Sequence, residues 1–342
     1  MIKSRYPVEG EPRSRGSSKS VAEALKAVRS SESAPLTEPP RLKLVNDASN
    51  EHFELKYFDP PADLDRYILT LFELRLRDGP LSDRHVGALG QIHLAVRGGV
   101  TGRFGDRIDS VEQGTALFNA FKVAVPYTYY GPFWCFGASF SPHGWAALTG
   151  ASVKEYGDRY MHANELLGTD IDRFYDDIVP RRLSGETSAE EACIELADWI
   201  RPRLNPVSAE HERVIDKVLA WLSSSLNPPI EDLVEDPEYS RRQIERLVQR
   251  YFGFAPNGLA RKFRAVRAAN LLAQSNLTDE AEAEIADAFV DQPHMIREIR
   301  RFCGFTPSRL GGQGGTMFER LTHMQSLERM PSYRVIGRSD SA

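Results

Sequence analysis

The chain has 342 residues with 43 Lys and Arg against 48 Asp and Glu, a net charge of −5, and 41% of its residues are hydrophobic. This length leaves room for two domains plus tails, and no run approaches the roughly 20 apolar residues that a membrane span requires. The opening sequence MIKSRYPVEGEPRSRGSSKS has no hydrophobic core after its basic residues, so we expect no signal peptide. Three scattered cysteines, Cys135, Cys193 and Cys303, lack metal-ligand spacing and suit a reducing compartment. We therefore expect a cytoplasmic protein without a membrane partner.

Residues 1–50 are rich in Ser, Pro, Glu, Arg and Lys, which predicts a disordered N-terminal segment. Residues 51–180 change in character. Short aromatic or β-branched runs, separated by Gly, Pro and Asp, predict antiparallel strands in a β-sandwich or barrel. These runs are FELKYF, QIHLAVRGG, VTGRFGDRI, GTALFNAF and FWCFGASF. Helical sequence follows at Ile171–Ile178 and Ala189–Ile200, and residues 181–206 are expected to form a helical linker that Pro202 and Pro206 interrupt.

The aromatic residues of this β domain are its candidate effector site. In the last run Trp134, Phe136 and Phe140 alternate with smaller residues, which places them on one face of a strand. Together with Phe104 and Phe121 they could line an apolar pocket for a small-molecule effector, or they could simply fill the core of a sandwich. His52, His85, His93 and His143 lack the spacing of a metal site, and no catalytic triad is evident. We expect no metal, no cofactor and no catalytic residues.

The segment Tyr239–Gly253, YSRRQIERLVQRYFG, predicts an amphipathic helix with a capping Ser at its start and Gly at its end. On a helical wheel Ile244, Leu247, Val248 and Tyr251 share one side. The opposite side is polar, and its candidate DNA contacts are Arg241, Arg242, Glu245, Arg246 and Gln249. Glu245 could accept a hydrogen bond from cytosine or pair with Arg241 or Arg242 within the helix.

The segment Asp291–Pro307, DQPHMIREIRRFCGFTP, repeats this design. An apolar stripe of Met295, Ile299 and Phe302 lies opposite a basic face, and the candidate DNA contacts are Gln292, His294, Arg297, Arg300 and Arg301. Arginine can contact phosphate or guanine bidentately, and Gln can do the same to adenine. The alternative for either helix is an ordinary solvated surface.

Between the two segments, Gly253–Ser275 has helical periodicity and predicts a connecting helix. From Tyr239 to Ala269 the charge is almost entirely basic, and acidic stretches flank this region on both sides. We therefore expect the connecting helix to add Arg261, Lys262, Arg264 and Arg267 to a basic surface on an otherwise acidic chain.

On these residues the chain resembles the DNA-binding domain of AraC/XylS-type transcription regulators over roughly His211–Leu310. The matching positions are Trp221, Ser240, Ile244, Arg246, Leu247, Gly253, Pro256, Arg264, Arg267, Ala268, Leu271, Leu272, Ile285, Ala286, Phe289, Asp291, His294, Arg297, Gly304, Thr306 and Pro307. The resemblance implies two helix–turn–helix units, joined by a linker helix, whose reading helices enter successive major grooves about 34 Å apart.

Two turns depart from the family pattern. Pro237 and Glu238 occupy the turn of the first unit, where the proline is expected to shorten the preceding helix, and Ala288 replaces a turn glycine in the second. The β domain, with SPHGWAALTG at Ser141–Gly150, resembles the cupin-like domain of a poorly characterised subgroup of these regulators. In the wider family such a domain binds an effector or mediates dimerisation.

The sequence thus predicts an α+β protein, with a sandwich or cupin-like sensory domain at 51–180, a linker at 181–206, an AraC-type DNA-binding domain at 207–311 and a tail at 312–342. The function this implies is that of a bacterial, sequence-specific transcription regulator and not an enzyme. The expected partner is double-stranded DNA, and RNA polymerase, a small-molecule effector and a second copy of the chain are further candidates. Two alternatives stay open: a cupin-like enzyme domain tethered to DNA, and a regulator that acts through protein contacts with non-specific DNA binding.

Overall fold

The computed structural model describes residues 53–77, 79–87, 90–272 and 277–307. The predictions for residues 1–50 and 312–342 lie outside these ranges. The strands are β1 (Phe53–Phe58), β2 (Ile68–Leu76), β3 (Leu81–His85), β4 (Gly90–Phe104), β5 (Arg107–Val111), β6 (Gly114–Phe118), β7 (Val125–Phe140) and β8 (Tyr160–His162). The helices are α2 (Pro142–Thr149), α3 (Val153–Tyr156), α4 (Asn164–Leu167), α5 (Asp170–Ser184), α6 (Ala189–Ile200), α7 (Ala209–Ser224), α8 (Ile230–Val234), α9 (Arg241–Phe252), α10 (Pro256–Leu272), α11 (Asp279–Ala288) and α12 (Gln292–Cys303).

The strands form one antiparallel sheet in the order β1-β2-β7-β4-β6-β8, with β3 paired to the first half of β7 and β5 to the second half of β4. The register between β4 and β7 shifts on either side of Arg97, and such irregularities bend a sheet. The Tyr160 backbone N–H donates to Asp109 Oδ2 at 3.1 Å, so the edge strand β8 comes close to β5. The predicted antiparallel strands and the α+β class are confirmed.

The sheet curves around an aromatic interior. Tyr57 and Phe72 from β1 and β2 pack with Tyr127, Tyr129 and Phe133 of β7 in one buried cluster. A second cluster joins residues of β6 and β8 to Phe121, which follows β6 in the chain. Strand β7 is buried on both faces along Phe133–Phe140, apart from the half-buried Trp134, because small residues fill the positions between its aromatic ones.

Helices α5 and α6 cover one side of the sheet. Ala192, Cys193 and Leu196 of α6 are fully buried, and α6 contacts β2 and β7. Arg182 of α5 donates to both carboxylate oxygens of Glu73 at 2.8 and 3.0 Å, and both side chains are buried. Residues 181–200, which we expected to belong to a linker, therefore pack as part of the sheet region, and the stretch without helix or strand that leads into α7 is residues 204–208.

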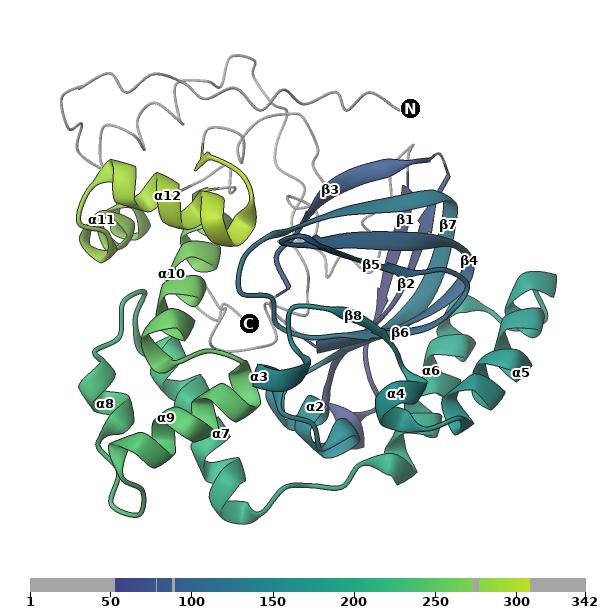
Figure 1. Cartoon of the computed structure of the whole chain (residues 1–342), viewed down its shortest axis with the longest axis horizontal. Coiled ribbons are helices and arrows are strands. Elements are labelled where there is room, and N and C mark those ends of the chain that lie inside the picture. Colours follow the sequence, from purple (N-terminus) through teal and green to yellow (C-terminus); the bar gives the residue numbers. More distant parts are fainter. Residues whose placement is uncertain (1–52, 78, 88–89, 273–276, 308–342) are drawn as a thin grey trace.

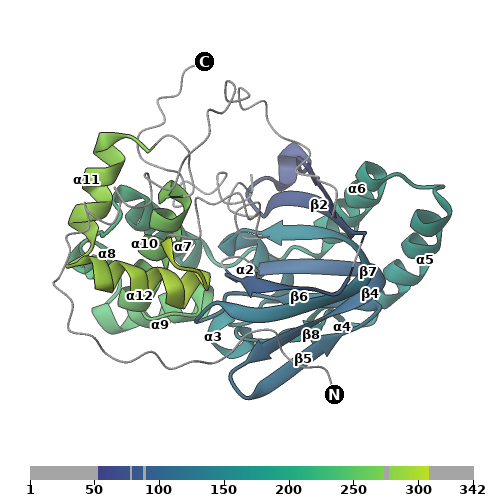
Figure 2. The same cartoon turned by 90° about the horizontal axis from the view of Figure 1, so that it is seen from above.

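Helices α7 to α12 form a separate helical part beside the sheet, as the views in Figures 1 and 2 agree. One hydrophobic cluster nevertheless continues from the sheet region into these helices. Helix α3 packs against α9 so closely that a Cβ on Gly253 would lie 2.9 Å from Val153 Cγ1. Asp216 of α7 accepts hydrogen bonds from His143 Nε2 at 2.7 Å and from the Arg66 guanidinium at 3.2 Å. The two parts share both apolar and polar contacts.

Candidate nucleic-acid interface

Helix α9, the first of the two predicted reading helices, begins and ends as its sequence predicts. Gln243 Oε1 accepts hydrogen bonds from the Ser240 backbone N–H at 2.9 Å and from Ser240 Oγ at 2.7 Å, which closes the first turn. Gly253 ends the helix with φ of 79° and donates its N–H to the Gln249 carbonyl at 3.0 Å. Both ends of the helix are therefore fixed by local bonds.

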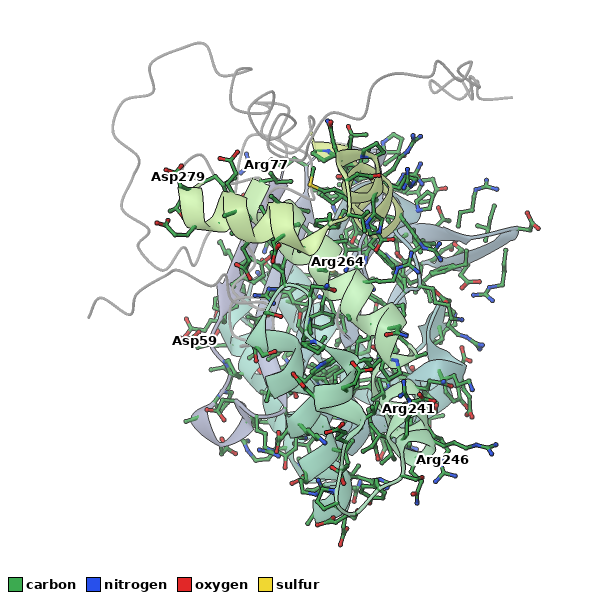
Figure 3. The ribbon with its side chains drawn as sticks, turned by 90° about the vertical axis from the view of Figure 1, so that its left-hand side faces the viewer. Asp59, Arg77, Arg241, Arg246, Arg264 and Asp279 are labelled. Atoms are coloured by element: carbon green, nitrogen blue, oxygen red, sulfur yellow. The ribbon has the colours of Figure 1, made fainter. Side chains whose placement is uncertain are left out.

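The faces of α9 are those of the helical-wheel prediction. Ile244, Leu247, Val248 and Tyr251 are buried, which confirms the apolar face. On the other side Arg242 and Arg246 are exposed, and no carboxylate among the described residues pairs with them. Arg241 Nε donates to Glu245 Oε1 at 3.2 Å, so the intrahelical role that we had left open for Glu245 is present. Gln249 is half-buried, and Figure 3 labels Arg241 and Arg246 at the end of the molecule that carries α9.

Helix α12 repeats this arrangement. Asp291 Oδ1 accepts from the His294 backbone N–H at 2.6 Å, and Gly304 ends the helix with φ of 85°. Met295, Ile299 and Phe302 are buried, as predicted. Arg297, Arg300 and Arg301 are exposed, whereas Gln292 and His294 are half-buried. The turn before α12 passes through Phe289 with φ of −123°, so Ala288 stands where no positive φ is needed.

The connecting helix α10 is present, but its basic residues do not form the surface that we expected. Lys262, Arg264 and Arg267 are all buried. Lys262 Nζ donates to the Gly87 and Phe121 carbonyls at 2.7 Å each, and Arg267 donates to the Leu222 and Ser225 carbonyls at the end of α7. Lys262 and Arg267 are buried because their side chains donate hydrogen bonds to backbone oxygens from distant parts of the chain. Of the four, only Arg261 is exposed.

Glu298 ties α12 to α10. Its buried carboxylate accepts from Arg261 at 2.6 Å and from Arg264 at 3.4 Å. Burial alone would raise the pKa of Glu298, but the hydrogen bond from Arg261 and the two cationic charges outweigh burial and leave that pKa below its usual value. Helix α12 is thus held on the connecting helix α10 by charge as well as by packing.

The unusual turn of the first unit is organised around Asp236. Helix α8 is five residues long and stops three residues before Pro237, in agreement with the expected shortening. The Asp236 carboxylate accepts from the backbone N–H groups of Glu238 and Tyr239 at 3.0 Å each, and from Arg213 and Lys217. The pKa of Asp236 is held well below its ordinary value, chiefly by the hydrogen bond from Arg213.

The five candidate effector residues are not brought together. Phe104 and Phe121 meet edge to face at 5.0 Å in one cluster, and Phe136 and Phe140 belong to the main core. Trp134 instead contacts two guanidinium groups: the Cζ atoms of Arg75 and Arg182 lie 3.9 and 4.8 Å from the centroid of its ring. The prediction of one pocket lined by all five is wrong, because Trp134, Phe136 and Phe140 lie on the face of β7 that packs into the main core, whereas Phe104 and Phe121 belong to the separate cluster beside β6 and β8. Within the described ranges, no group of His, Cys, Asp and Glu is placed to hold a metal.

Two small cavities are present elsewhere. One lies inside the curved sheet and is lined by His85, His93, Phe118 and Tyr160, among others. The second lies between the sheet region and the helices, against Phe140, Trp145, Phe252 and Lys262. Of the predicted effector residues, only Phe140 lines either one. No local pattern marks Trp145 or Lys262 as lining a cavity, because the residues around them come from distant segments of the chain.

Two helix–turn–helix units, joined by a buried helix and packed beside an antiparallel sheet, define the class of architecture that the resemblance implied. The chain is 31% identical over 140 residues to the HTH-type transcriptional regulator GbdR of Pseudomonas aeruginosa, in two strains. The resemblance to AraC/XylS-type transcription regulators is confirmed. The match covers 40% of this chain and 38% of the length of that relative.

No protein-family model matches the chain. Among solved structures, ToxT of Vibrio cholerae O395 is 9% identical, with 80% of this chain and 100% of that chain covered and a TM-score of 0.41. The AraC-like transcriptional activator CuxR is 15% identical, with 63% and 86% covered and a TM-score of 0.28. Among the described helices, none combines the length and apolar character needed to cross a membrane.

Proposed function

We propose that this protein is a bacterial transcription regulator that binds double-stranded DNA through α9 and α12. The observation that carries the proposal is that both helices bury one apolar face, expose arginines on the other and pack against the buried helix α10. The protein acts by binding and not by catalysis.

Within this proposal, the sites on α9 are Arg241, Arg242, Glu245, Arg246 and Gln249, and those on α12 are Gln292, His294, Arg297, Arg300 and Arg301. Arg242, Arg246 and Arg297 are the strongest of these because their guanidinium groups are exposed and unpaired among the described residues. The sheet region is the effector-binding or dimerisation part, and the cavity beside His93 and Phe118 replaces the predicted pocket as the candidate effector site.

Selection of genomic fragments by the purified full chain, followed by sequencing and footprinting of the bound sites, tests this function. We expect enrichment of one sequence pattern and protection of two major grooves about one helical turn apart. Protection of a single groove would remove α9 from the interface. Recovery of fragments without a shared pattern would favour the non-specific alternative.

A further inference from the structure

The end of the second reading helix rests directly on the sheet region. The Ala124 backbone N–H donates to the Arg301 carbonyl at 2.9 Å. Next to this bond the chain of Arg84, on β3, lies against Gly304: a Cβ on Gly304 would lie 2.6 Å from Arg84 Cγ and 2.7 Å from Arg84 Cβ. The aliphatic stem of Arg84 is therefore packed on Gly304, the residue that caps the C-terminus of α12.

Arg84 resembles the exposed arginines of α9 and α12 in having no carboxylate partner among the described residues. Many arginines of the sheet region are held by carboxylates, including Arg66, Arg75, Arg77 and Arg107. Arg84 is exposed, and none of the carboxylates in the described part of the chain pairs with its guanidinium. The same holds for the exposed arginines of α9 and α12, namely Arg242, Arg246, Arg250, Arg297, Arg300 and Arg301. A guanidinium without a carboxylate partner can contact a phosphate without first breaking an ion pair.

The position of Arg84 beyond the C-terminus of α12 favours phosphate over bases. A helix in the major groove is flanked by the two phosphate backbones, because the groove is only about 12 Å wide. Contacts from residues that flank a reading helix, and from its C-terminal end, go to the backbone in known docking arrangements.

We propose that Arg84 contacts a DNA phosphate beside the groove that α12 enters, so that the DNA-binding surface extends from the second helix–turn–helix unit onto the sheet region. This inference rests on the proposed function. The phosphate contact of Arg84 would make the sheet region contribute directly to DNA affinity. A shift of β3 relative to the C-terminus of α12 would move this contact.

The test measures the salt dependence of DNA binding by the full chain. Three variants are compared with the wild type on one selected duplex and one random duplex, by fluorescence anisotropy over a range of KCl concentrations. Arg84→Met keeps the aliphatic stem against Gly304 but removes the charge, and Arg84→Lys keeps the charge. Arg97→Met is the matched control. Like Arg84, Arg97 is exposed and has no carboxylate partner among the described residues. Unlike Arg84, it lies opposite Trp134 in the register of β4 and β7, and Trp134 contacts Arg182 of α5.

Loss of one phosphate contact should reduce the slope of log K against log[salt] by about 0.9. We expect this reduction for Arg84→Met on both duplexes, a slope close to that of the wild type for Arg84→Lys, and no change for Arg97→Met. A wild-type slope for Arg84→Met would overturn the inference, and so would equal reductions for Arg84→Met and Arg97→Met, because these would reflect net charge alone. Thermal melting of each variant checks that α12 keeps its place, with Arg84→Gln as a second neutral variant. If the wild type bound no duplex, the proposed function itself would fail, which is a different result from normal binding with an unchanged slope.

Discussion

Arg297 of α12 and Arg246 of α9 occupy equivalent settings, each exposed on the polar side of a helix whose other side is buried. The second unit keeps the family pattern more closely, so we expect it to carry most of the base specificity. Arg297→Ala should weaken binding to a selected site by about 1–3 kcal/mol, the usual value for losing a bidentate base contact. Anisotropy titrations on selected and random duplexes measure this. Equal weakening on both would assign Arg297 to phosphate.

Lys262 leads to a prediction about pH. Burial lowers the pKa of its ammonium to about 7, and its two hydrogen bonds are the number that a neutral amine can donate. In the unfolded chain the pKa is about 10.4. Between these values the unfolded state binds more protons, so the contribution of Lys262 to stability rises with pH from about 7 to 10. Its slope is at most about 1.4 kcal/mol per pH unit.

Urea unfolding of the wild type and of Lys262→Met at pH 7 and pH 9 checks this prediction. The difference in unfolding free energy between the two proteins should shift in favour of the wild type at the higher pH. His85 and Cys303 lie near Lys262, but burial keeps both neutral in the folded protein between pH 7 and pH 9, so their titration cancels in the difference. A difference that does not change with pH would mean that Lys262 is charged in the folded protein.

At the scale of the elements, the short turn between α8 and α9 depends on one carboxylate. Asp236→Ala would leave two backbone N–H groups and the cations of Arg213 and Lys217 without their acceptor. We expect a loss of about 1–3 kcal/mol in the free energy of unfolding, with a smaller loss for Asp236→Asn, which keeps one acceptor oxygen. Urea unfolding measures both. Equal stability of Asp236→Ala and the wild type would show that the turn is held by packing alone.

How far the elements could be predicted depends on where their determinants lie. Helices α9 and α12 have caps, an apolar stripe and a terminal glycine within about fifteen residues, so local sequence is sufficient. Strand β2 was not among the predicted runs, although Phe72–Leu76 alternates apolar and polar residues; Glu73 is buried nonetheless, because it pairs with Arg182 of α5. The buried cations of α10 were misjudged because the acceptors of Lys262 lie on Gly87 and Phe121, far away in the chain. Local pattern cannot reveal such partners.

At the scale of the whole molecule, the shared core changes what we expect of the two parts. The division near residue 206 stays a prediction of domain organisation, and the helical part has its own buried residues, such as Trp221, Ile244 and Val266. It also packs Phe252 and Phe254 in the same cluster as Trp145 and Val153 of the sheet region. Contacts of this kind couple the unfolding of two units, whereas units joined only by a linker unfold separately.

We therefore expect the full chain to melt in a single calorimetric transition, and a fragment of residues 207–311 to fold but to melt at a lower temperature. The fragment exposes apolar side chains that the sheet region covers, each worth about 1.5–3 kcal/mol when fully buried, and it should bind a hydrophobic dye that the full chain does not. Its DNA binding should be weaker than that of the full chain, because it lacks any contact or second copy that the sheet region supplies. Differential scanning calorimetry of both proteins is the measurement. Two separate transitions in the full chain, with one matching the fragment, would show that the two parts are energetically independent in spite of their contacts.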